Sequence, residues 1–296
     1  MSAAISPTTG KAYGVQRVCC AWEMPRSSFY GRIARKAVPP VLLKRGPKTP
    51  LTDDEVLALI RTDLATSTFV GEGHRKVWGR LRFVKGIKVG RKRVLRLMRE
   101  NNLLSPHRVV QGPPKEHKGK IITAAPNVMW GTDGTKVFTS EEGWCWLFTA
   151  VEHWNAECVG WHVTKNGDRF AALQPVSMGI KARFGSVGAA AARGLVLRMD
   201  HGTQYLSEHF QNQIKFWGIT PSFAFVAEPQ TNGVTERFNR TIKEQVIYGR
   251  HYRTIEEVRA AVADFMDRYN QQWLVEKLGF RSPRQAFEEY QLNMAA

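Results

Sequence analysis

Apolar residues follow two different spacings along this chain, and the change between them falls near residue 126. Before that point they recur every three or four residues, as Val94, Leu97 and Met98 do, which is the period of an amphipathic helix. After it, runs rich in β-branched and aromatic residues follow one another closely, which is typical of strands. The pattern predicts a helical N-terminal part and a C-terminal part that contains a sheet.

Two helix pairs are predicted in the N-terminal part, and both resemble a helix-turn-helix. Their segments are 13–22 with 26–36, and 75–82 with 90–99. Between the pairs, Thr52 and Glu55 have the spacing of a capping box, which predicts a helix that starts at residue 53. Proline-rich basic segments at 37–50 and 105–126 are predicted to be linkers. We therefore expect three parts: 1–50, 51–125 and 126–296.

The C-terminal part is predicted to be a mixed α/β sheet with helices on both faces. Three strands in succession favour antiparallel pairing, and the helices and strands that alternate after them favour parallel strands. The strands are expected at 129–139, 144–151, 157–164, 195–199 and 219–225. The helices are expected at 169–182, 207–217, around Glu236 as far as Tyr248, and last at 255–271, with a loop at 227–232.

The net charge of +17 is unevenly distributed along the chain, and its distribution indicates the kind of partner that the chain binds. Residues 1–125 hold 25 Lys and Arg against 8 Asp and Glu, whereas residues 126–296 hold 18 of each. An excess confined to the helical part favours nucleic-acid binding over a membrane surface or simple solubility. A basic helix after a glycine turn suits the major groove, although a solvated helix face is the plain alternative. The candidate contacts are Arg75, Lys76, Arg91, Lys92, Arg93 and Arg96.

Other features exclude several classes of protein. No apolar run approaches the roughly 20 residues that a membrane span needs, and the first residues do not form a secretory signal. The four cysteines, Cys19, Cys20, Cys145 and Cys158, lack zinc-ligand spacing and are expected to be reduced thiols of a cytosolic protein.

Three acidic residues are the candidate chemistry. Asp133 lies inside an apolar strand, Asp200 follows another, and Glu236 lies early in a helix. Singly, each is more typical of a turn, a cap or a solvated face. Together they favour a metal site, because acids beside such apolar runs are seldom left unpaired. Three converging carboxylates can hold two divalent cations for phosphoryl transfer.

These residues and their neighbours resemble an insertion-sequence transposase of the retroviral-integrase superfamily, specifically the second-reading-frame protein of the copy-out/paste-in family. Asp133, Asp200 and Glu236, the last two separated by 35 residues, match its Asp-Asp-Glu pattern. The runs Asp200-His201-Gly202-Thr203-Gln204-Tyr205 and Asn232-Gly233-Val234-Thr235-Glu236-Arg237-Phe238-Asn239 match its second and third motifs. The resemblance implies a ribonuclease-H-like core preceded by an all-α helix-turn-helix region. It also implies a DNA contact by Lys243, two helical turns after Glu236.

The resemblance further implies two Mg²⁺ or Mn²⁺ ions on the three acids, and cleavage and strand transfer at DNA ends. The implied partners are double-stranded DNA (terminal repeats and target), further copies of the chain on DNA, and the first-reading-frame protein of the element. No membrane partner is expected, and the implied place is the bacterial cytosol, at the nucleoid. Residues 271–277 depart from the family, and the zinc module of retroviral integrases is absent from the sequence.

Three alternatives stay open on the sequence. One is another ribonuclease-H-like nuclease, which the two helix-turn-helix segments oppose. Another is a catalytically silent DNA-binding regulator derived from a transposase, which the intact acid triad opposes. The third is an RNA-binding protein, for which a glycine- and aromatic-rich binding pattern is missing.

Overall fold

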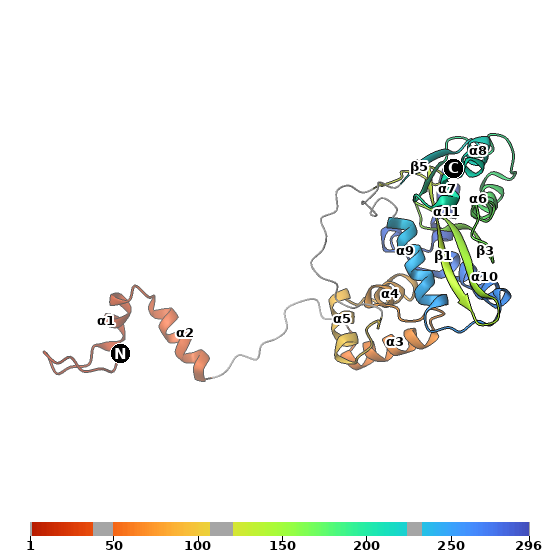
Figure 1. Cartoon of the computed structure of the whole chain (residues 1–296). Coiled ribbons are helices and arrows are strands. Elements are labelled where there is room, and N and C mark those ends of the chain that lie inside the picture. Colours follow the sequence, from red (N-terminus) through yellow and green to blue (C-terminus); the bar gives the residue numbers. More distant parts are fainter. Residues whose placement is uncertain (1, 38–49, 107–120, 224–232, 296) are drawn as a thin grey trace. The chain divides into compact units, whose positions relative to one another are not determined.

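The structure, a computed structural model, describes residues 2–37, 50–106, 121–223 and 233–295 (Figure 1). Its contacts group the chain into two compact units, Met1–Pro50 and Leu51–Ala296. The further boundary that we expect near residue 125 lies inside the second unit and remains a prediction. Among the described residues, no helix is both long enough and apolar enough to cross a membrane.

The first unit holds two helices, α1 (Gly14–Ala21) and α2 (Arg26–Ala37). They are joined by a tight turn in which Glu23 has a φ of 49° and Met24 donates its N–H to the carbonyl of Cys19. Cys19 is buried. The predicted helix pair is therefore present, with ends that differ from the predicted ones by a residue or so.

The second unit begins with a small helical bundle, α3 (Asp53–Thr66), α4 (His74–Gly79), the π-helical turn η1 (Arg80–Val84) and α5 (Arg91–Glu100). The predicted capping box is present, since Thr52 and Glu55 each bond the other's backbone N–H. The bundle has its own apolar core, which includes Val56, Ile60, Val77, Leu81, Val94, Leu97 and Met98.

A five-stranded mixed sheet follows, in the order β3-β2-β1-β4-β5. The strands are β1 (Met129–Thr139), β2 (Gly143–Glu152), β3 (Cys158–Thr164), β4 (Val196–Met199) and β5 (Thr220–Phe223). The first three pair antiparallel, whereas β4 lies parallel to both β1 and β5. The predicted mixed sheet is confirmed, and β1 becomes its central strand.

Helices cover both faces of this sheet, as predicted (Figure 1). One face packs on α6 (Arg169–Phe184), α7 (Thr203–Leu206) and α8 (Glu208–Phe216), around Trp130 and Phe148. The other packs on α9 (Gly233–Ile242), the π-helical turn η3 (Lys243–Ile247) and α10 (Ile255–Gln272), around Val137, Leu147 and Phe265. Alternate residues of β1 therefore point into two separate cores.

Two differences from the predicted elements lie at the C-terminal end. The helix at 255–271 was expected to be the last, but a short 3₁₀ turn η4 (Glu276–Leu278) and a further helix α11 (Pro283–Ala295) follow it. The helix of Glu236 changes to a π-helical turn after Ile242, before its predicted end. The predicted loop at 227–232 lies outside the described residues.

Candidate active site

Asp133 lies in the middle of β1, on the face of the sheet that α9 covers. Its carboxylate accepts hydrogen bonds from the backbone N–H of Gly134 (2.7 Å) and from Nδ2 of Asn239 (2.6 Å). Burial raises the pKa of Asp133; the bond from Gly134 opposes this rise and the charge of Asp200 adds to it. The carboxylate is therefore held in place but is poorly compensated as an anion.

Asp200 directly follows β4, the strand that lies beside β1. The parallel register pairs Met129 with Val196 and Gly131 with Arg198, so its continuation brings Asp200 opposite Asp133. Oδ1 of Asp200 accepts the N–H of Gly202 at 2.9 Å, which fixes the carboxylate in the turn that leads into α7. Two acids 67 residues apart in sequence are thus neighbours through strand pairing alone.

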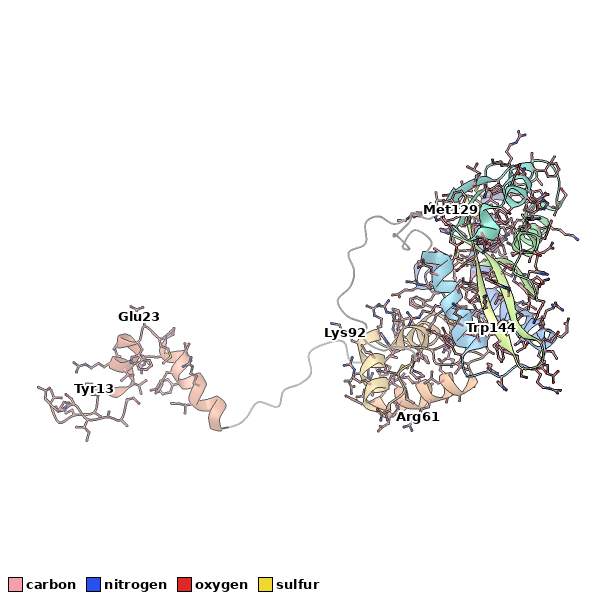
Figure 2. All side chains as sticks on the ribbon, viewed as in Figure 1. Tyr13, Glu23, Arg61, Lys92, Met129 and Trp144 are labelled. Carbon is pink, nitrogen blue, oxygen red and sulfur yellow. The ribbon has the colours of Figure 1, made fainter. Side chains whose placement is uncertain are left out.

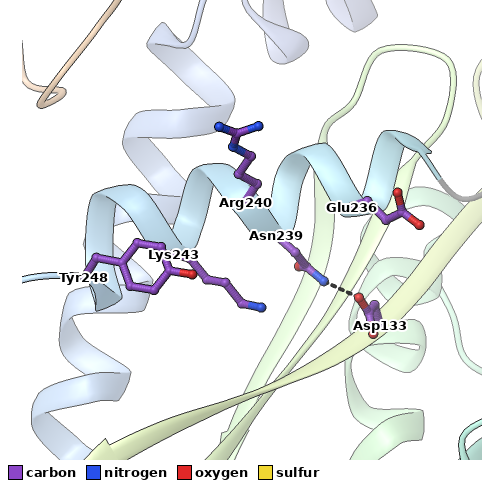
Figure 3. Close-up of a pocket in the computed structure, with 6 residues that line it drawn as sticks. All are labelled: Asp133, Glu236, Asn239, Arg240, Lys243 and Tyr248. Carbon is purple, nitrogen blue, oxygen red and sulfur yellow. Dashed lines mark hydrogen bonds between the residues drawn. The ribbon is translucent and has the colours of Figure 1, made fainter. Parts of the chain in front are cut away.

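Glu236 projects from the first turn of α9 toward the same region (Figure 3). Burial is the larger cause that raises the pKa of Glu236, and the charge of Asp133 raises it further. The two carboxylates are therefore close enough to disfavour each other's ionisation. Glu236 and Asp133 both line an open cavity of about 310 Å³, together with Asn239, Arg240, Lys243 and Tyr248.

Asn239 is a site residue that sequence reasoning did not single out. It lies three residues after Glu236 and is buried between α9 and the sheet. Its Nδ2 donates to Asp133 and its Oδ1 accepts from the hydroxyl of Thr149 at 3.2 Å. Thr149 is the residue that pairs with Asp133 across β1 and β2. The signals in the sequence are its place at the end of the run that matches the third motif and its position next to the buried Phe238, on the helix that carries Glu236.

The other end of the cavity is basic. Arg240 follows Glu236 by about one helical turn on α9, and Lys243 by about two, at the start of η3. Both line the cavity together with Tyr248 (Figure 3), and Arg240 also pairs with Glu244 at 2.9 Å. The charge of Lys243 lowers the pKa of Asp133, which places its ammonium within electrostatic range of that carboxylate. A cavity with carboxylates at one end and cations at the other has the charge pattern that a metal-bound phosphodiester needs.

The donor set suits a hard divalent cation, which prefers carboxylate oxygens. Within the described residues, none of the three acids forms an ion pair with Lys, Arg or His. However, Asp200 does not line the cavity, and the described part of the chain contains no group of three His, Cys, Asp or Glu side chains already arranged to hold a metal. The sharing of one cation site by all three acids therefore remains a prediction.

The predicted DNA contacts of the bundle fall into different surroundings, and four of them pair with acids. Arg75 and Arg91 pair with Glu276, and Arg93 and Arg96 pair with Asp53. Lys76 lies over the ring of Trp273. Lys92 is exposed on α5. The seventh candidate, Lys243, is the one that belongs to the cavity.

Comparison with known families gives three matches along the chain. A family described as "HTH-like domain" matches residues 53–110, which contain the bundle. Two families described as "Integrase core domain" match residues 123–229 and 217–283, which contain the sheet and all three acids.

Whole proteins of this kind also match. The "Transposase InsD for insertion element IS2-9" of Escherichia coli (strain K12) is 27% identical over 301 residues, covering 96% of both chains. Among solved structures, the HTLV-2 integrase catalytic core domain in complex with magnesium is 18% identical, covers 55% of this chain and 98% of that chain, and has a TM-score of 0.39. A chain of the simian T-cell lymphotropic virus intasome in complex with PP2A regulatory subunit B56 gamma is 16% identical, covers 77% of this chain and 74% of that chain, and has a TM-score of 0.47.

The structural likenesses are too weak to add to the assignment, which rests on the family matches and on the full-length relative. Both integrase-core matches and the helix-turn-helix match occur in one chain, in the order expected from the sequence motifs. The chain therefore belongs to the insertion-sequence transposases of the integrase superfamily.

Proposed function

We propose that this transposase cuts DNA at the terminal inverted repeats of its element and joins the freed ends to target DNA, with Asp133, Asp200 and Glu236 as its catalytic acids. The observation that carries the proposal is the placement of the acids: the register of β1 with β4 brings Asp200 opposite Asp133, and Glu236 lines the same cavity as Asp133. They come from two neighbouring strands and a facing helix, and Asp133 interacts with both of the others. Carboxylates gathered in this way, with no ion-pair partner among the described residues, are arranged for a cation.

Divalent metal is a property of the integrase-core family, and we propose two Mg²⁺ or Mn²⁺ ions held by the three acids. Bound there, such a pair supplies activation of the attacking oxygen and charge stabilisation for the leaving 3′-oxygen. Asn239 would hold the carboxylate of Asp133 at a fixed angle, because its amide is itself fixed by Thr149. Arg240 and Lys243 would bind the phosphates that flank the scissile bond.

The attacking oxygen would be water for end cleavage and a DNA 3′-hydroxyl for strand transfer, so no covalent protein intermediate is required. Tyr205 is unsuited to be a nucleophile, because its hydroxyl is fully buried and burial raises its pKa far above the usual range. We also propose that copies of the chain assemble on the element ends, with the first-reading-frame protein of the element as a further partner. Because the substrate is chromosomal DNA, we place this assembly at the bacterial nucleoid.

The test is the substitution Asp200→Asn in the full chain. The amide keeps the acceptor for the N–H of Gly202 but removes one negative charge from the acid set. We expect Mg²⁺-dependent nicking and strand transfer on terminal-repeat DNA to fall by at least about a hundredfold. DNA affinity in a gel-shift assay should stay within about twofold, because the basic bundle lies elsewhere in the chain.

Asp267→Asn is the matched control, since it makes the same chemical change at an exposed acid of α10. This variant should leave both the Mg²⁺-dependent nicking and strand transfer and the DNA affinity unchanged. Strand transfer by Asp200→Asn at the level of the wild type would contradict the catalytic assignment. Loss of transfer in both variants would show that any acid-to-amide change disturbs the chain, and the assignment would again lose its support.

A further inference from the structure

The segment Trp273–Phe280, between α10 and α11, packs against the helical bundle. We call this segment the seat. Residues 271–277, which include the first part of the seat, depart from the family pattern, and the sequence alone leaves their role open. In the structure the seat contacts α4 and α5, although about 200 residues separate the two partners in the chain. Which cations of the bundle remain for DNA depends on what the seat covers.

Polar contacts with the seat engage three of the predicted DNA-binding residues. Lys76 lies 3.6 Å from the ring centre of Trp273, and its ammonium donates to the carbonyl oxygen of Leu274. Glu276 accepts from Arg75 at 2.9 Å and from Arg91 at 3.3 Å. The two arginines come from different helices, so one carboxylate holds both α4 and α5 to the seat.

Apolar contacts bring the same surfaces into close packing. The ring of Phe280 stacks on Phe83 at 5.1 Å and meets Trp78 edge-on at 5.2 Å. A Cβ added to Gly79 would lie 2.2 Å from Cδ1 of Phe280, so only glycine permits this approach of α4. Exposed ion pairs alone contribute little and exchange readily, so the packing of Phe280 against Trp78 and Phe83 is what holds the seat to the bundle.

Two further arginines of α5 form ion pairs with an acid of the bundle itself. Asp53, in the first turn of α3, accepts from Arg93 at 2.7 Å and from Arg96 at 2.5 Å. Hydrogen bonds from these two arginines lower the pKa of Asp53. Arg96 also pairs with Glu100 one turn further on. These arginines join α3 to α5 and are less available to an external anion.

Lys92 and Arg99 remain on α5. Both are exposed, and neither forms an ion pair within the described part of the chain. They are seven residues apart, about two helical turns, so they share one face. That face is opposite Val94, Leu97 and Met98, which point into the bundle core. Figure 2 shows Lys92 on the side of the bundle that lies away from the sheet.

We infer that the bundle binds the DNA backbone through the face of α5 that carries Lys92 and Arg99. Contacts with the seat engage Arg75, Lys76 and Arg91 instead, and these three residues fix the bundle to the segment that follows α10. This inference rests on the proposed function only in that the chain binds element-end DNA. A helix whose solvent-facing cations are unpaired, and whose flank is fixed to the protein, has the geometry with which a recognition helix enters a groove.

The experiment compares two double substitutions in the full chain, each removing two positive charges from the bundle: Lys92→Gln/Arg99→Gln and Arg75→Gln/Arg91→Gln. The readout is the slope of log affinity against log salt for terminal-repeat DNA, measured without divalent metal. Each lost phosphate contact reduces the slope by about 0.9. We expect a reduction of about 1.8 for the first variant and less than about 0.5 for the second.

Equal reductions, or a larger one for Arg75→Gln/Arg91→Gln, would overturn the inference. The DNA affinity of Glu276→Gln is a second measurement, and this variant leaves the residues of the bundle unchanged. It removes the shared partner of Arg75 and Arg91, so affinity should stay the same or rise, and a weaker affinity would count against the seat. Strand transfer by the wild type is measured separately with Mg²⁺. Its absence would refute the proposed function without changing the comparison of slopes.

Discussion

Asn239 joins two strands of the sheet to the helix that carries Glu236. One side-chain amide bonds Asp133 on β1 and Thr149 on β2, and it does so from a buried position on α9. Because both polar atoms of its amide are hydrogen-bonded, the rotamer of Asn239 is fixed. The carboxylate of Asp133, which accepts one of these bonds, is held in a fixed orientation as a result. A hydrogen bond to a charged group typically contributes about 1.5–3 kcal/mol.

Asn239→Ala should therefore lower Mg²⁺-dependent strand transfer by about ten- to a hundredfold, since small displacements of a catalytic group have effects of that size. DNA affinity should change by less than about twofold. The comparison variant is Thr149→Val, which removes the bond at the other end of the amide but leaves the bond to Asp133. It should lower transfer only a few-fold, and a larger loss than in Asn239→Ala would exclude this positioning role.

At the scale of single residues, the sequence predicts three candidate acids but not the residues that hold them in place. Asp133, Asp200 and Glu236 can be found because acids beside apolar runs are unusual and because their spacing matches a known pattern. The role of Asn239 cannot be found in this way, because it depends on a hydrogen bond to Asp133, which is 106 residues away in sequence. The same holds for Glu276, whose two arginine partners are brought to it only by the fold.

Among the elements, α6 lies unusually close to the sheet. A Cβ added to Gly160 of β3 would stand 1.9 Å from the backbone carbonyl oxygen of Pro175, in the middle of that helix. A backbone atom cannot turn aside as a side chain can, so the helix itself would have to move. The glycine thus sets the distance between α6 and β3, on the face where Trp130 and Phe148 are buried.

Gly160→Ala should lower the free energy of unfolding by about 1–3 kcal/mol or more, as overpacking does in a close-packed core. Urea denaturation of the purified chain measures this. The control is Gly188→Ala, where a Cβ would meet nothing within 4 Å, and where we expect a change within about 0.5 kcal/mol. If the two variants were equally stable, α6 could not lie where the structure places it.

Most elements could be predicted, because amphipathic periodicity and capping are local properties of the sequence. The strand at Met129–Thr139 and the capping box at Thr52 are examples. The helix α11 was missed, since Leu292 and Met294 are exposed and only a short apolar stripe is buried. The π-helical turns could not be recognised either, because one extra residue in a turn leaves the apolar spacing nearly unchanged.

For the whole molecule, the contacts predict that residues 51–296 behave as one folding unit. The loop between α3 and α4 inserts Phe69 between Phe265 and Trp273, and Val70 exchanges two hydrogen bonds with Gln245. Arg268 also donates to the carbonyl oxygen of Thr68 at 2.6 Å. Phe69 is therefore part of the core that surrounds α9, whereas the helices of the bundle keep a core of their own.

A fragment of residues 51–296 should melt within a few degrees of the full chain, because the first unit is compact by itself. A fragment of residues 126–296 should melt about 10 °C lower, since the loss of a buried Phe alone costs about 3–5 kcal/mol and each kcal/mol shifts Tm by about 2–4 °C at this size. Calorimetry of both fragments measures the difference. Equal melting temperatures would show that the bundle is an independent domain.

The strand order has a consequence for a chain that is still being made. The ribosome releases the bundle and the three antiparallel strands first, but β4 must return to pair with β1 before Asp200 reaches Asp133, and Glu236 arrives only with α9. A nascent or prematurely terminated chain that stops before residue 233 thus lacks one acid altogether. On the proposed assignment of the acids, such a product would carry the basic helices without the means to cut, and the host chromosome would not meet nuclease activity until synthesis of the transposase is nearly complete.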